Sequence, residues 1–185
     1  MARIPFVTPN DIPESERPAF DRFVESRSGV PAAGPYALLL HMPEIAQRVE
    51  ALRLCLRDEK SLPQPLQELV MITVAREMDC PYIWHAHAAA ARDIGVSGDI
   101  IDSIREKRTL TGLDQQQQAV VDYTRELLRE RKVSKPTFDR ASGSLGQRGT
   151  LALTNLIACY AVLAYNMNAY ELVAPVSAKE PALPL

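Results

Sequence analysis

The sequence has few cysteines, little net charge and no long apolar run, and each shortage excludes a class of protein. Three cysteines among 185 residues, scattered and odd in number, argue against a disulfide framework and for free thiols in a reducing compartment. The net charge of -2 gives no general attraction to nucleic acid or anionic lipid. The most apolar stretch, residues 151–165, is shorter than the roughly 20 residues of a membrane span. We therefore expect no nucleic-acid or membrane partner.

The first residues, MARIPFVTPND, lack the apolar core of a secretory signal, which favours a cytoplasmic location. A chain of this size fits one domain, because it buries roughly 70% of the surface that it exposes when unfolded. Both glycine-rich segments, SRSGVPAAGP and SGSLGQRG, are short and flanked by apolar segments that need each other's cover. We predict a single domain over residues 1–185, with an N-terminal arm over about 1–13 and a C-terminal tail over about 175–185.

Apolar residues recur every three or four positions in several segments, and no segment alternates apolar and polar residues for the length of a strand. The sequence thus predicts an all-α fold of about seven or eight helices. Asp114 and Gln117 form the pattern of a capping box, and SGSLGQRG is expected to be a connection before a last helix over about 150–173. The helix that begins at Pro43 carries apolar residues at spacings of four, three and four, and this face is expected to be core. These residues are Ile45, Val49, Leu52 and Leu56.

Two consecutive predicted helices, residues 65–78 and 81–94, form a helical hairpin that carries the candidate site. The first is apolar nearly all round and needs cover from its neighbours, although it contains Glu68. On the second helix, offsets of three, four and seven residues place four side chains on one face. They are Cys80, Ile83, Trp84 and His87. If the two helices fold back against each other, Glu68 and His87 lie at similar heights along the hairpin. The offset is within about one helical turn, because each residue of a helix rises about 1.5 Å.

Glu68 and Cys80 each have a chemical and a structural interpretation. Burial in an apolar helix would raise the pKa of Glu68 and make it a proton donor or acceptor near neutral pH. Alternatively, a backbone amide or an arginine such as Arg76 satisfies the carboxylate. The free amide groups at a helix start favour a reactive thiolate at Cys80, whereas the alternative is an inert buried thiol. Cys55 and Cys159 are interpreted as packing residues.

His85 and His87 stand two residues apart, and two residues of helix turn through about 200°, so their imidazoles should point to opposite sides. We therefore predict no metal site, and the role of His85 stays open. Several aromatic side chains either line a pocket for a small aromatic or lactone-like compound or belong to the core. These are Tyr82, Trp84, Tyr160, Tyr165 and Tyr170.

The segment ELVMITVAREMDCPYIWHAHAAAARDIGVS, which begins at Glu68, resembles the core motif of the carboxymuconolactone decarboxylase and alkylhydroperoxidase superfamily. In that motif a glutamate lies twelve residues before a cysteine and a histidine seven residues after it, and Glu68, Cys80 and His87 keep this spacing. The resemblance implies an AhpD-like helical bundle and catalytic roles for these three residues. It also implies a homo-oligomer (dimer, trimer or hexamer) with its pocket between subunits, and no metal or organic cofactor.

The hydroperoxidase branch of this superfamily carries a Cys-x-x-Cys motif, and Ile83 stands here in place of the second cysteine. The run of an aromatic residue, a tryptophan and a histidine instead resembles the decarboxylase-like branch, whose members act on small cyclic acids and lactones. This implies a lyase or isomerase in which Glu68 and His87 move protons. Two alternatives stay open, a thiol-dependent hydroperoxidase acting through Cys80 and a non-catalytic oligomeric binding protein. The residues expected to contact the small-molecule substrate are Tyr82, Ile83 and Trp84.

Overall fold

The computed structural model describes residues 2–174 and 180–185, and every regular element in this part of the chain is a helix. The elements are η1 Pro9–Asp11, η2 Glu14–Glu16, α1 Arg17–Ser26, α2 Pro35–Leu39, α3 Pro43–Arg57, α4 Gln64–Glu77, α5 Pro81–Asp93, α6 Gly98–Arg105, α7 Gln115–Glu130 and α8 Lys135–Ala169. The eight α-helices confirm the predicted all-α class. The capping box is confirmed as well, because Asp114 accepts a hydrogen bond from the Gln117 amide at 2.8 Å.

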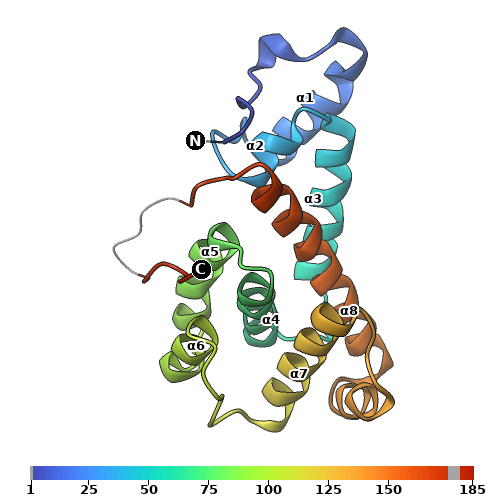
Figure 1. Cartoon of the computed structure of the whole chain (residues 1–185). Helices are drawn as coiled ribbons and strands as arrows, with labels where there is room; N and C mark the ends of the chain where they lie inside the picture. Colours follow the sequence, from blue (N-terminus) through green and yellow to red (C-terminus); the bar gives the residue numbers. More distant parts are fainter. Residues whose placement is uncertain (1, 175–179) are drawn as a thin grey trace.

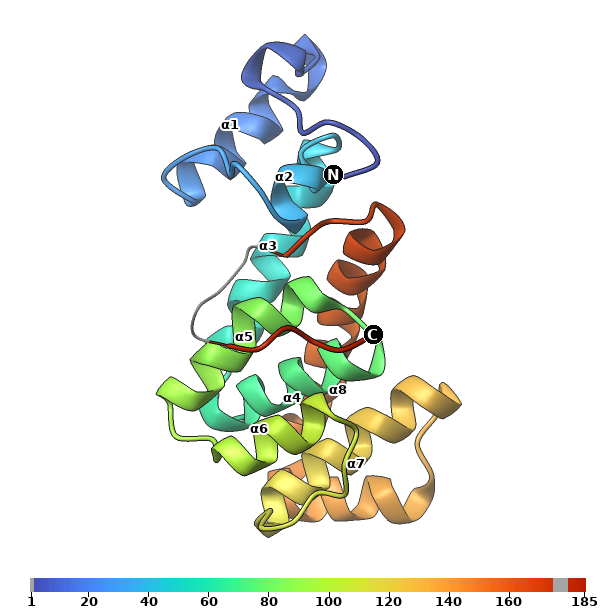
Figure 2. The same ribbon diagram turned by 60° about the vertical axis from the view of Figure 1, so that its left-hand side comes forward.

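Helix α4 lies at the centre of the larger group of helices, packed by α5, α6, α7 and α8. Figures 1 and 2 show α1 and α2 at one end of the molecule, α4 to α7 at the other, and α3 and α8 running between them. Every residue of α4 from Leu66 to Arg76 is buried. This confirms that the helix needs cover all round, and it explains why a charged side chain within it must find partners.

The hairpin of α4 and α5 forms as predicted. Asp79 adopts a left-handed conformation (φ 46°), and the amide of Cys80 donates to the Ala75 carbonyl at 2.8 Å, which closes the end of α4. Pro81 then starts α5, where its missing amide costs nothing. Gly95 follows the end of α5 with φ 92°, the left-handed geometry expected of it. The site-bearing helices are therefore adjacent and closely joined.

The buried face of α3 differs from the one predicted. Ile45 and Leu52 are about two-fifths exposed, whereas Ala46 is fully buried and Glu50 is 4% exposed. The prediction of an apolar core face is therefore wrong for Ile45 and Leu52, whereas Leu56 is buried and Val49 is partly buried against the core. The physical reason is the ion pair between Arg53 and Glu50. Because the two charges neutralise each other, the inner side of the helix can bury charged side chains.

Helix α8 consists of two helical segments that meet at Gly146, whose backbone (φ 70°, ψ 174°) is not helical. The predicted SGSLGQRG connection therefore contains the break between the two segments, but the residues on either side of Gly146 are helical rather than a loop. The helix ends at Ala169 rather than near Val173. Its length and hydropathy would suffice to cross a membrane, but it packs here against α3, α4 and α7, as the core helix of a bundle does.

The last residues of the chain lie across α5, as Figure 2 shows. Of the predicted tail over about 175–185, residues 175–179 lie outside the described part. The carbonyl of Pro181 accepts a hydrogen bond from Trp84 Nε1 at 3.2 Å, and Glu180 pairs with Arg92 at 2.6 Å. Leu183 is buried. The described end of the chain is thus a packed part of the fold.

Candidate active site

Four helices bring one polar cluster together inside the bundle. Glu68 of α4 is 2% exposed, and its Oε2 lies 2.7 Å from Nδ1 of His87 on α5. Its other oxygen, Oε1, lies 2.7 Å from Nη2 of Arg57 on α3. The ring of Tyr160 on α8 meets the imidazole of His87 edge-on, with centroids 5.1 Å apart. The predicted pair of Glu68 and His87 therefore exists, and Arg57 completes it.

The charge state of Glu68 differs from the one expected. Burial, the largest influence, would raise the pKa of this carboxyl, but the hydrogen bond and charge of His87 together with Arg57 outweigh it, and the pKa lies below its usual range. The expectation of a raised pKa is therefore wrong. The predicted structural partner Arg76 is wrong too, because Arg76 instead pairs with Asp79.

An ionised Glu68 fixes the tautomer of His87. A carboxylate can only accept hydrogen bonds, so the Nδ1 of His87 must carry the hydrogen that lies between them. The second ring nitrogen, Nε2, has no hydrogen-bond partner among the described residues and is the basic nitrogen of the neutral ring. Glu68 thus orients His87, and His87 is the group able to exchange protons with a ligand.

His87 lines a cavity of about 330 Å³ between α5, α8 and the segment that enters α2. Tyr82, Ile83 and Tyr160 line the same cavity, which places two of the three expected substrate contacts beside the imidazole. The other walls are contributed by residues that the sequence did not single out. They are Arg27, Pro31, Ala33, Gly34, Pro35, Tyr36, Arg53, Ala86, Leu163 and Met167.

Two arginines give the cavity a positive wall. Arg27 and Arg53 both pair with the buried carboxylate of Glu50, Arg53 through contacts of 2.7 and 2.9 Å. One of these two positive charges is therefore left without a matching negative charge. Since Arg57 and Glu68 balance each other, the residues in and behind this cavity sum to one positive charge with His87 neutral. This arrangement favours a ligand with a single negative charge.

Cys80 lies apart from the cavity. Its side chain is fully buried and is not among the lining residues. Burial raises the pKa of the Cys80 thiol, and the backbone amides of Ile83 and Tyr82 offset this only in part. The expected low-pKa thiolate at the helix start is therefore wrong, and the structure favours the buried-thiol interpretation. Burial also raises the pKa of Cys159, to about 11, which agrees with a packing residue, whereas Cys55 is exposed and its interpretation as a packing residue is wrong.

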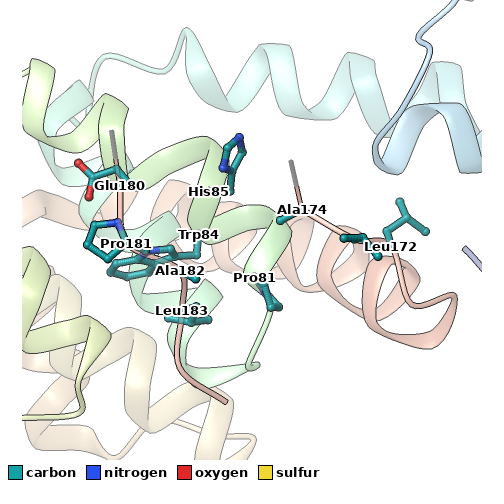
Figure 3. Close-up of a pocket in the computed structure, with 10 residues that line it drawn as sticks. Pro81, Trp84, His85, Leu172, Ala174, Glu180, Pro181, Ala182 and Leu183 are labelled. Atoms are coloured by element: carbon teal, nitrogen blue, oxygen red, sulfur yellow. The ribbon is translucent and has the colours of Figure 1, made fainter. Parts of the chain in front are cut away.

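Trp84 and His85 belong to the other side of α5. Both line a larger cavity of about 400 Å³ against the end of the chain, and Figure 3 shows Trp84 beneath Pro181 and Ala182. The expectation that Trp84 shares a space with His87 is wrong, because the C-terminal residues cover the indole. His85 and His87 face different cavities, which confirms that they point to opposite sides. The Glu68–His87 pair does not line the larger cavity, so this cavity is not the candidate active site.

We did not predict from the sequence that Arg27, Arg53 and Glu50 belong to the site, because we expected charged side chains to face solvent. A signal was present in the sequence, since Ala46, Glu50, Arg53 and Arg57 follow one another at spacings of four, three and four. Such a row on one helix face, with a glutamate among arginines, is an internal ion-pair stripe when neighbouring helices supply further acids. Tyr160 gave no comparable signal, because a tyrosine within an apolar helix is usually a packing residue.

Residues 43–126 match the model of the Carboxymuconolactone decarboxylase family, a stretch that holds Arg57, Glu68, Cys80 and His87. No curated protein matches the sequence. Among solved structures, an alkylhydroperoxidase AhpD core protein described as peroxidase-related, from Ralstonia eutropha JMP134, is 15% identical with a TM-score of 0.73, covering 94% of this chain and 92% of that one. A peroxidase-related protein from Silicibacter sp. TM1040 is 16% identical with a TM-score of 0.72, covering 95% and 92%.

A third similar structure is the debrominase Bmp8 in complex with 2,3,4-tribromopyrrole, which is 14% identical with a TM-score of 0.70 and covers 92% of this chain and 90% of that one. At these identities the likeness concerns the fold. The fold is the all-helical fold of AhpD-like proteins. The match to the Carboxymuconolactone decarboxylase family covers residues 43–126, the part of the chain that holds the buried glutamate–histidine pair.

Proposed function

We propose that this protein is a cofactor-independent lyase or isomerase that acts on a small organic acid or lactone carrying one negative charge. The observation that carries the proposal is the 2.7 Å contact between Glu68 and Nδ1 of His87, which leaves Nε2 as a base beside a cavity with a positive wall. The match to the family model supports an enzyme, as does the shared fold with a debrominase solved in complex with 2,3,4-tribromopyrrole.

The proposed chemistry is proton transfer. Nε2 of His87 takes a proton from a carbon next to a carbonyl or carboxyl group of the ligand, and the electron pair of the C–H bond shifts to the carbonyl oxygen as an enolate. The imidazolium that forms is stabilised by Glu68, and it returns the proton at another carbon to complete an isomerisation. In a decarboxylation, loss of carbon dioxide generates the enolate, which takes its proton from a protonated His87.

The residues that line the cavity can stabilise the negative charge that develops on the ligand. Arg53 and Arg27 lie where they can hold a carboxylate, and the phenol of Tyr160 borders the imidazole. The cavity of about 330 Å³ has room for about eleven heavy atoms at roughly 30 Å³ each, the volume that a water molecule occupies in the liquid. This size fits a five- or six-membered ring with a carboxylate.

We also propose that the protein is a cytoplasmic homo-oligomer. The apolar residues Ile45 and Leu52, seven residues apart on one side of α3, are each about two-fifths exposed. Exposed apolar rows of this kind commonly mark an association surface. A second copy of the chain is the partner that the superfamily resemblance suggests, and sedimentation velocity of the purified protein tests this.

The test of the proposed function is a panel of small lactones, unsaturated acids and keto acids assayed with the wild type and with His87→Ala, Glu68→Gln and Cys80→Ser. The proposal predicts turnover that falls by about 100-fold to 10,000-fold in His87→Ala, the typical contribution of a positioned acid or base. Cys80→Ser should retain activity, since its thiol lies outside the cavity. Activity that survives in His87→Ala but is lost in Cys80→Ser would contradict the proposal.

The wild type and Cys80→Ser also test the alternative function, a thiol-dependent hydroperoxidase. A hydroperoxidase needs a thiolate that reaches the peroxide, whereas Cys80 is buried with a raised pKa. The proposal therefore predicts that peroxide consumption with a dithiol reductant is no faster for the wild type than for Cys80→Ser. Cys80-dependent peroxide consumption would favour the alternative.

A further inference from the structure

A second, apolar pocket adjoins the candidate active site. This side pocket has a volume of about 180 Å³. Its lining residues are Ala2, Phe6, Ala33, Gly34, Tyr82, Leu172 and Val173. Three of them, Ala33, Gly34 and Tyr82, also line the cavity of His87. The two spaces thus share one wall, and Tyr82 is the only large side chain among the three shared residues.

The position of the Tyr82 side chain in this wall depends on its close approach to the backbone at Gly34. Gly34 has φ +87°, and a methyl group built on it would lie 2.8 Å from the Tyr82 hydroxyl oxygen. Because Gly34 has no side chain, the phenol end of Tyr82 reaches the backbone of the opposite segment and closes the gap. The Tyr82 hydroxyl makes no hydrogen bond to any described residue, so packing alone holds the ring in place.

The two sides of this wall differ in chemistry. The cavity of His87 contains Arg27 and Arg53, whereas the side pocket is lined by apolar side chains from the N-terminal arm and the segment after α8. At roughly 30 Å³ per heavy atom, the side pocket has room for about six more atoms. A ligand that filled both spaces would carry an anionic end and an apolar substituent.

We propose that Tyr82 is a specificity-determining residue that limits the length of the apolar substituent on the substrate by closing the side pocket. The inference rests on the proposed function, because it assumes that the anionic end of the substrate occupies the cavity of His87. With Tyr82 in place, compact acids fit. Truncation of this side chain joins the two spaces and admits acids with a longer apolar chain.

The experiment uses binding of sodium benzoate and its 4-ethyl, 4-butyl and 4-hexyl derivatives, measured by isothermal titration calorimetry. The proteins are the wild type, Tyr82→Phe and Tyr82→Ala. In the wild type and Tyr82→Phe, affinity should stop rising or fall beyond the ethyl derivative. In Tyr82→Ala it should continue to rise, by about fourfold for each methylene that becomes buried, which is about 16-fold from ethyl to butyl.

A second variant tests where the added chain lies. Val173 lines the side pocket but not the cavity of His87. Val173→Trp, introduced into Tyr82→Ala, adds a large side chain to this lining and should remove the gain for the butyl derivative while leaving benzoate binding unchanged. The same dependence on chain length in the wild type and Tyr82→Ala, or a gain that survives Val173→Trp, overturns the role of Tyr82. Absence of benzoate binding to all of these folded proteins overturns the anion-binding cavity, and with it both proposals.

Discussion

The substitution Glu68→Gln tests the cluster through the stability of the fold. Both partners lie 2.7 Å from Glu68: His87 donates a hydrogen bond to it through Nδ1, and Arg57 forms an ion pair with it through Nη2. A glutamine of the same shape offers one oxygen acceptor and one NH₂ donor in place of two acceptors. One partner therefore faces a donor, and Arg57 keeps a charge that nothing nearby neutralises.

The expected loss follows from the burial of the three groups. Breaking a buried ion pair by removing one partner typically costs about 3–5 kcal/mol. The side chain of Glu68 is 3% exposed, but those of Arg57 and His87 are 20% and 19% exposed, so water offsets part of the penalty. We expect a decrease of about 3 kcal/mol in the free energy of unfolding, which corresponds to roughly 6–12 °C in melting temperature for a chain of this size.

The assay is urea denaturation of the wild type and Glu68→Gln between pH 3 and pH 7. Because the folded state lowers the pKa of Glu68 below its ordinary 4.5, the carboxylate adds stability above that pH, and this contribution is lost as the pH falls through the lowered value. The difference between the two proteins should therefore be largest near neutral pH and shrink in acid. Glu44→Gln is the control, because the Glu44 side chain is 48% exposed and its partners Arg22 and Arg48 are 54% and 77% exposed, so the change should stay below about 1 kcal/mol. Equal stability of Glu68→Gln and the control at pH 7 would refute this reasoning.

Further predictions concern the thiols, the C-terminal segment and the kink. Brief treatment of the native protein with N-ethylmaleimide should label Cys55 and spare Cys80, as mass spectrometry of tryptic peptides will show; labelling of Cys80 at a comparable rate would contradict its burial. Trp84→Phe removes the hydrogen bond to Pro181 and should lower the free energy of unfolding by about 1 kcal/mol in chemical denaturation, and an unchanged value would count against that contact. Gly146→Ala places a side chain at φ 70° and should destabilise the fold by about 1 kcal/mol or more; a rise in melting temperature would argue for an unkinked helix.

The sequence predicted the helical class and the hairpin well because both depend on local signals. Pro81 and Gly95 mark the start and the end of α5, and an apolar run marks α4 as a central helix. The face of α3 could not be predicted in the same way. Hydrophobic periodicity identifies an apolar row, but a buried salt bridge such as that of Glu50 with Arg53 depends on the neighbouring helices.

The candidate site was predictable in part. The spacing of Glu68 and His87 on adjacent helices sufficed to place them in contact, and the structure confirms that contact. The role of each group was not predictable, because the pKa of Glu68 depends on Arg57, which comes from a different helix. Trp84 was misplaced for a related reason, since its cover comes from the far end of the chain.

The central claim is that the Glu68 carboxylate holds the hydrogen of the His87 ring on Nδ1, so that Nε2 is the nitrogen that exchanges protons with the ligand. Long-range ¹H–¹⁵N correlation NMR of protein labelled with ¹⁵N-histidine, assigned with His87→Ala, measures this directly. We expect an unprotonated Nε2 and a protonated Nδ1 in the neutral form of the ring, with loss of this preference in Glu68→Gln. A neutral His87 protonated at Nε2 in the wild type would contradict it.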